Sequence, residues 1–269
     1  MAPRNWYSTP SSSATLSTGP EPWRSPVERR GGAGGNDLNF LLHRHLAARD
    51  LGSEIAALGA MLPDLWPMAS RRVRPRTKDT PPPAGDPLVD ALSSGVRHHL
   101  AADAWFHSSE VFRQGQAETA ASFRLAAPRA GRLMAHIAWE LCLDGALVRR
   151  LGTAAVVDRL RPAVQRCRGP VLAAAVRAWH PALADDPGAE EDFDRRLDGL
   201  LRSLLGGDWI DGYRHGAGLA ARISGVRRRV GLPPWTGIDA ERLSRALDGL
   251  LASADERLDG LLEDAVIVL

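Results

Sequence analysis

Two apolar stretches of this 269-residue chain each carry three polar side chains spaced four residues apart. The trios are His99, Asp103 and His107 in the first stretch, and His136, Glu140 and Asp144 in the second. Four residues come close to one turn of an α-helix, so this spacing aligns each trio along one helix face. Helical bundles build metal sites from imidazole and carboxylate groups on facing helices. The pattern therefore predicts an all-α domain in which these two helices face each other.

The rest of the chain also shows helical periodicity, and no segment has the alternation typical of strands. Asp37 or Asn39 could cap a first helix that ends at Gly52. A second helix is expected from about Ser53 to Leu62, stopping at Pro63, and a long loop at 66–87. Further helices are expected at about 88–114, 117–124, 128–150, 153–166, 170–179, 190–206, 208–229 and 239–264.

Composition sets the domain organisation and the compartment. Residues 1–36 are rich in Ser, Pro, Thr and Gly, which predicts a disordered extension because they bury too little apolar surface. A single helical domain is expected over 37–269, with the polar motifs within 38–150 and further helices at 151–269. No stretch reaches the ~18 apolar residues of a membrane helix, and the start of the chain lacks a signal-peptide pattern. We therefore expect a soluble, cytoplasmic protein without a membrane span.

The charge distribution bears on the binding partners of the protein, and the cysteine content bears on its compartment. The chain has 34 basic and 32 acidic side chains, and the basic ones are spread along it, so no nucleic-acid partner is expected. Cys142 and Cys167 are too few for a disulfide framework, and neither stands in a metal-binding spacing. The low number and the spacing of the cysteines fit a reducing compartment.

Two further polar blocks precede the two trios, which we call stripes, so that four motifs follow one another along the chain. The blocks, in order, are Asn-Phe-Leu-Leu-His-Arg-His-Leu-Ala at 39–47, Gly-Ala-Met-Leu-Pro-Asp-Leu at 59–65, Gly-Val-Arg-His-His-Leu-Ala-Ala-Asp-Ala-Trp-Phe-His at 95–107, and His-Ile-Ala-Trp-Glu-Leu-Cys-Leu-Asp-Gly at 136–145. This ordered set resembles the acyl carrier protein phosphodiesterase family over roughly residues 38–150. The resemblance implies a helical bundle related to the HD-type metal phosphohydrolases. It also implies a divalent-metal reaction that releases 4′-phosphopantetheine from a holo acyl carrier protein partner.

The chain departs from that family at two positions. Ala135 precedes His136 where family members carry Asp, and His107 stands where they usually carry an acid. Glu140 or Asp144 could supply the missing carboxylate from the same helix face.

The chemistry of phosphodiester hydrolysis points to the same residues. A divalent ion neutralises phosphate charge and activates water, and mixed imidazole and carboxylate ligands suit Mn, Zn or Fe. The predicted metal ligands are His45, Asp64, His99, Asp103, His136 and Asp144. Asp103, His107 and Glu140 are the predicted catalytic groups, acting as general acid or base or by orienting an imidazole.

Other interpretations stay open. His43 is interpreted as structural, Asp64 could cap a turn, and Glu140 and Asp144 could pair with arginines on a solvated face. The whole chain could also be an inactive or regulatory metal-binding module. A metal-dependent hydrolase acting on phospholipid or nucleotide is a further alternative, because the fold alone does not choose the substrate.

Overall fold

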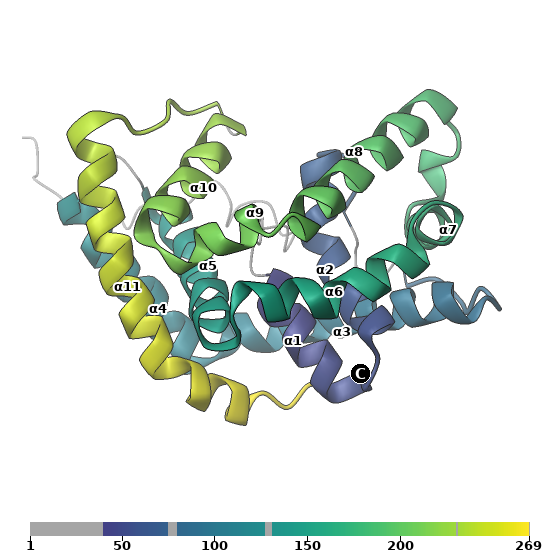
Figure 1. Cartoon of the computed structure of the whole chain (residues 1–269), viewed down its shortest axis with the longest axis horizontal. Coiled ribbons are helices and arrows are strands. Elements are labelled where there is room, and N and C mark those ends of the chain that lie inside the picture. Colours follow the sequence, from purple (N-terminus) through teal and green to yellow (C-terminus); the bar gives the residue numbers. More distant parts are fainter. Residues whose placement is uncertain (1–39, 75–79, 127–130, 230, 269) are drawn as a thin grey trace, which may run out of the picture. The chain divides into compact units, whose positions relative to one another are not determined.

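The computed structural model describes residues 40–74, 80–126, 131–229 and 231–268 (Figure 1). Within these ranges every regular element is a helix and no strand occurs, which confirms the all-α prediction. The predicted extension at 1–36 lies outside the described residues. The α-helices are α1 (Phe40–Leu51), α2 (Glu54–Ala69), α3 (Pro87–Ser108), α4 (Glu110–Ala126), α5 (Gly131–Leu151), α6 (Thr153–Cys167), α7 (Pro170–Trp179), α8 (Pro187–Leu205), α9 (Asp208–Asp211), α10 (Gly216–Arg229) and α11 (Gly237–Asp264). Two short 3-10 turns, η2 (Pro181–Leu183) and η3 (Gly212–Arg214), complete them.

Helix α1 is fixed at both ends. The amide N–H groups of Leu41 and Leu42 donate to the Asp144 carboxylate at 3.1 and 2.8 Å, so a side chain of α5 caps the start of α1. The predicted caps Asp37 and Asn39 lie outside the described residues. Gly52 follows the helix with φ +59°, a left-handed conformation that favours glycine. This confirms the predicted end of the helix.

Helix α2 differs from the prediction because it continues through Pro63 and Pro67 to Ala69. Each proline removes one backbone donor from the helix. Most of the side chains of α2 are buried, and α2 packs against α1, α3, α6 and α8. This packing on several sides offsets the lost hydrogen bonds, so the expected stop at Pro63 was wrong.

Two other expected helices are divided. The helix expected at 88–114 breaks at Ser109, whose backbone is extended and whose side chain accepts a hydrogen bond from Phe112 N–H at 3.2 Å. Ser109 thereby caps the start of α4. The helix expected at 208–229 breaks at His215, also extended, into α9, η3 and α10.

Two glycines bring α2 and α3 into backbone contact. A Cβ atom at Gly59 would lie 2.1 Å from the carbonyl oxygen of Leu92, and one at Gly95 would lie 1.8 Å from that of Ala56. No side chain larger than hydrogen fits at either position. The close approach sets the distance between the two helices that carry Asp64 and His99.

Helix α5 is the second centre of packing. It contacts α1, α4, α10 and α11, and Figure 1 shows α11 running alongside α4 and α5. Helices α3 and α5 meet where His107, in the last turn of α3, approaches Glu140. The predicted facing of the two stripes is therefore confined to this end of α3.

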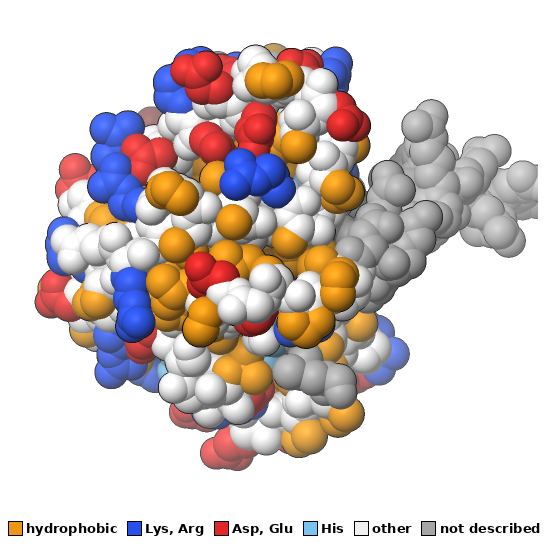
Figure 2. Space-filling view, turned by 90° about the vertical axis from the view of Figure 1, so that its right-hand side faces the viewer, with side chains coloured by type: hydrophobic (Ala, Val, Ile, Leu, Met, Phe, Trp, Pro, Cys, Tyr) orange, Lys and Arg blue, Asp and Glu red, His pale blue; other side chains and the backbone are white. Residues whose placement is uncertain are grey.

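Charges of both signs are interspersed on the face in Figure 2, around a group of hydrophobic side chains.

None of the helices in the described ranges has the length and apolar character needed to cross a bilayer.

Candidate metal centre

The first candidate ligand group joins α1 and α3. The ligand atoms of His43, His99 and Asp103 all lie within 4.8 Å of one another, and the two imidazole rings are 4.0 Å apart between centroids. Asp64 of α2 borders the group, with Oδ1 3.9 Å from Nε2 of His99. Three helices thus supply two imidazoles and two carboxylates to one buried region.

The orientation of His99 is set by the backbone of α2. Its Nδ1–H donates to the carbonyl of Ala60 at 2.9 Å, which leaves the lone pair on Nε2, the nitrogen facing Asp64. A carbonyl on one ring nitrogen is the usual partner of a histidine whose other nitrogen binds metal. The contact depends on the close approach of α2 and α3 at Gly59 and Gly95.

His43 is the most informative member of this group. The residue is 1% exposed, and among the residues that the structure describes neither ring nitrogen has a hydrogen-bond partner. Burial lowers the pKa of His43 well below its usual value, and the nearby His99 and His107 lower it further. A neutral imidazole without a polar partner is expensive to bury. A metal ion is a partner that would satisfy it.

The second candidate ligand group joins α3 and α5. Its members are His107, His136 and Glu140, whose ligand atoms also lie within 4.8 Å of one another. Glu140 Oε1 lies 2.9 Å from Nε2 of His136 and 3.2 Å from Nε2 of His107. Glu140 is fully buried, whereas the side chains of His107 and His136 are 29% and 22% exposed. This group is therefore the more accessible to solvent of the two.

The charge of Glu140 is maintained by its two histidines. Burial favours the protonated carboxyl, but the hydrogen bonds from His107 and His136 outweigh it and lower the pKa of Glu140. Glu140 is thus an anion at neutral pH and a suitable ligand for a cation.

Gln116 of α4 completes the surroundings of His136. Its amide nitrogen lies 3.1 Å from Nδ1 of His136 and donates to it, so the ring proton sits on Nε2 and faces Glu140. A metal ion on Nε2 requires the proton on Nδ1 instead. Rotating the amide of Gln116 by half a turn presents its oxygen to accept that proton.

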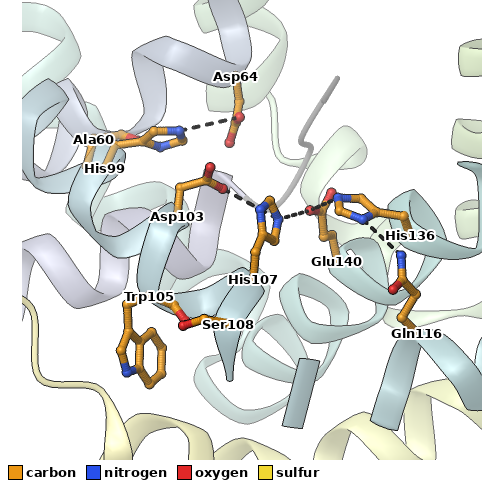
Figure 3. Close-up of polar contacts among 10 residues, drawn as sticks. All are labelled: Ala60, Asp64, His99, Asp103, Trp105, His107, Ser108, Gln116, His136 and Glu140. Atoms are coloured by element: carbon orange, nitrogen blue, oxygen red, sulfur yellow. Dashed lines mark hydrogen bonds and ion pairs between the residues drawn. The ribbon is translucent and has the colours of Figure 1, made fainter. Parts of the chain in front are cut away.

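Asp103 connects the two groups. Asp103 belongs to the first group, and its Oδ1 lies 3.6 Å from Nε2 of His107. From there a series of polar contacts runs through His107, Glu140 and His136 to Gln116 (Figure 3). A carboxylate between two ligand groups can serve either of them. The arrangement can hold one or two ions.

The structure brings together most of the residues that the sequence singled out. The predicted residues in the two groups or beside them are Asp64, His99, Asp103, His107, His136 and Glu140. Two predicted ligands, His45 and Asp144, lie outside both groups. Asp144 is fully buried and its two oxygens accept the N–H groups at the start of α1. Half-buried His45 has Arg44 and Arg49 as neighbouring charges, and burial together with these charges lowers its pKa.

His43, interpreted as structural from the sequence, occupies the place expected for His45. A sequence signal could have identified it: residues three or four positions away on its helix face are Phe40, Leu46 and Ala47, all buried. The face of His45 ends instead at exposed Arg49. On an N-terminal helix with two histidines two residues apart, the one flanked by apolar residues on both sides points inward.

A search of protein-family profiles, a search of curated proteins and a search of solved structures each returned no match to this chain.

Proposed function

We propose that the protein is a metal-dependent phosphoester hydrolase whose ion or ions are held by the two ligand groups. One observation carries the proposal: a fully buried histidine, His43, has unpartnered ring nitrogens and lies against His99 and Asp103. Helical proteins satisfy such inward-facing sets of imidazole and carboxylate with metal. The mixed donor set suits Zn, Mn or Fe better than Mg or Ca, which prefer oxygen ligands alone.

The chain supplies the groups that hydrolysis needs. A divalent ion, when bound, would neutralise phosphate charge and bring the pKa of its water toward neutrality. His99 is held in position by the Ala60 carbonyl and needs no reorientation. Glu140 stays ionised beside His107, the more exposed imidazole, so the pair can take up a proton and pass it to a leaving oxygen. Buried Trp139 and Phe106 flank this region and limit access of bulk water.

The finer assignment, release of 4′-phosphopantetheine from an acyl carrier protein by an HD-type bundle, is supported by the ordered motifs within 38–150. Glu140 provides a carboxylate next to His136, which supports the idea that it replaces the family acid absent at Ala135. Phospholipid and nucleotide phosphodiesters are the alternative substrates.

The test combines metal content with turnover. Full-length protein dialysed against Zn or Mn is expected to retain at least one ion per chain by elemental mass spectrometry. It should also hydrolyse bis(4-nitrophenyl) phosphate. His99→Ala should abolish turnover and lower the metal content, whereas His215→Ala, which removes an exposed histidine, should change neither. A chain that binds no divalent ion would refute the proposal.

A substrate panel then separates the candidates. Holo acyl carrier protein, nucleotides and phospholipid vesicles are compared at equal phosphodiester concentration, with released phosphopantetheine, nucleotide product or head group measured directly.

A second candidate is a metal-binding module without turnover. The observation that favours it is Ala135, which is fully buried beside His136 where the resembled family has an acid. Metal retention without hydrolysis of any substrate in the panel would favour this candidate.

A further inference from the structure

A pocket that shares no lining residue with the two ligand groups is lined mainly by basic and apolar side chains. It has a volume of about 330 Å³, at the lower end of the range for small-molecule sites. Its basic residues, all from α10, are Arg222, Arg228 and Arg229. Its apolar wall is formed by Met68, Leu141, Leu200, Trp209 and Tyr213.

The three arginines have no acidic partner in the part of the chain that the structure describes. Other arginines nearby do: Arg214 pairs with Asp211 and Arg202 pairs with Asp198. Guanidinium groups are usually neutralised by carboxylates or phosphates when they converge on one cavity. The charge of this pocket is therefore left for a ligand to balance.

The pocket is held in shape before any ligand binds. The guanidinium of Arg222 lies over the ring of Trp209, 5.0 Å from its centroid. Glycines bring α10 against η3, because a Cβ at Gly218 would lie 1.9 Å from the carbonyl oxygen of Gly212. Arg71 adds a fourth positive charge nearby, since its guanidinium donates to the carbonyl of Arg229.

Tyr213 contributes a neutral donor to the same pocket. Burial raises the pKa of Tyr213, so its phenol stays protonated at physiological pH and can donate a hydrogen bond to an anion. No acidic side chain lines the pocket among the described residues. Ser203 adds a hydroxyl to the lining, and this hydroxyl can also donate. The polar side chains of the lining can therefore all donate to a ligand rich in acceptor oxygens.

We propose that this pocket binds a phosphomonoester with an apolar or aromatic carbon portion. A phosphomonoester carries nearly two negative charges and three acceptor oxygens, which match several guanidinium groups better than a carboxylate, with one charge and two oxygens. The leucines, Met68 and Trp209 receive the carbon portion. The pocket shares no lining residue with the two ligand groups, and its proposed ligand does not depend on the hydrolase proposal.

The test measures binding of phenyl phosphate to the full-length chain by calorimetry, in the presence of a chelator so that no metal ion contributes. Saturable binding is expected. Arg222→Gln and Arg228→Gln should each weaken it about tenfold or more, since charge-assisted hydrogen bonds are lost. Arg228 is exposed, so its variant keeps the test valid if the loss of Arg222 impairs folding. Arg161→Gln removes an exposed arginine from α6, which contributes no lining residue, and should bind as the wild type does.

Two further probes examine the chemistry of the ligand. Benzoate and inorganic phosphate are both expected to bind at least tenfold more weakly than phenyl phosphate. If benzoate bound as tightly as phenyl phosphate, the assignment of a phosphate group to the ligand would be overturned. If inorganic phosphate bound as tightly as phenyl phosphate, the assignment of an apolar carbon portion would be overturned. No saturable binding of phenyl phosphate, or equal weakening in Arg161→Gln, would overturn the site itself.

Discussion

His107 and Glu140 meet across two helices although they are 33 residues apart in the chain, with Nε2 of His107 3.2 Å from Oε1 of Glu140. The same imidazole nitrogen lies 3.6 Å from Asp103. One histidine therefore touches a carboxylate from each ligand group. This contact implies that the two groups act as neighbouring halves of one centre.

We expect up to two ions per chain, one for each ligand group. His99→Ala removes a ligand from the first group and His107→Ala removes one from the second, so each variant should retain the ion of the other group. Native mass spectrometry of the metal-loaded proteins counts the ions. A wild-type chain that never holds more than one ion would show that the two ligand groups form a single site.

His43→Leu should stabilise the metal-free protein while weakening metal binding. The substitution removes buried nitrogens that have no hydrogen-bond partner among the described residues, which is worth about 1–3 kcal/mol. Urea unfolding in the presence of a chelator measures the free energy, and metal titration measures the affinity.

His98→Leu is the matched control for that substitution. His98 is equally buried, but its Nε2 lies 2.9 Å from the Asp50 carboxylate, so its loss should destabilise the protein. If His43→Leu destabilised the metal-free chain as much as His98→Leu, His43 would be a structural residue after all.

Glu140→Gln should lower stability at neutral pH but not at low pH. The pKa of Glu140 is lowered in the folded protein by the two histidines, despite burial. Its carboxylate therefore contributes stability above the unfolded value of 4.5, and this contribution is lost as the pH falls through the folded pKa. Charged hydrogen bonds of this kind are worth about 1.5–3 kcal/mol.

Urea unfolding of the metal-free wild type and Glu140→Gln between pH 3 and pH 8 gives the comparison. If the wild type exceeded Glu140→Gln in unfolding free energy by the same amount at pH 3 as at pH 8, Glu140 would not be an ionised, histidine-bonded carboxylate.

Gly95→Ala should destabilise the protein by about 3 kcal/mol or more, because the new methyl group would overlap the Ala56 carbonyl and overpacking forces the backbone apart. Gly249→Ala is the control within α11, where a Cβ meets nothing within 4 Å. It should stabilise the protein by about 0.5–1 kcal/mol through helix propensity. Thermal unfolding with a chelator compares the two variants.

Asp144→Ala should lower stability by about 1–2 kcal/mol, the usual effect of losing a helix cap, and leave the number of bound ions unchanged. Urea unfolding and elemental analysis of the same preparation test both parts. Loss of an ion in this variant would restore Asp144 to the ligands that the sequence predicted.

The sequence predicted the helical class and the residues of the stripes because both depend on local periodicity. His99, Asp103 and His107 share a face of α3 whatever surrounds them. The cap of α1 could not be predicted, since Leu41 and its acceptor Asp144 are 103 residues apart. Because this distant contact cannot be read from local spacing, the sequence predicted Asp144 as a third metal ligand beside His136 and Glu140.

The course of α2 shows a second limit. Pro63 is a local signal for the end of a helix, and only the helices packed around α2 override it. The choice between His43 and His45 depended on which face of α1 is buried, for which the apolar neighbours of His43 were the one local signal. Local spacing thus identified which residue types carry the chemistry, and tertiary contacts decided which of them converge.

The close approach of α2 and α3 at Gly59 and Gly95 has a consequence for how this protein can change over time. Where side chains set the spacing of two helices, gradual replacement of one apolar residue by another moves the helices apart or together. Here the main chains themselves touch, so substitutions elsewhere in the core alter the outer turns of α2 and α3 before they alter the separation of Asp64 and His99. The chain can therefore drift widely in sequence while the imidazole and carboxylate atoms keep their positions.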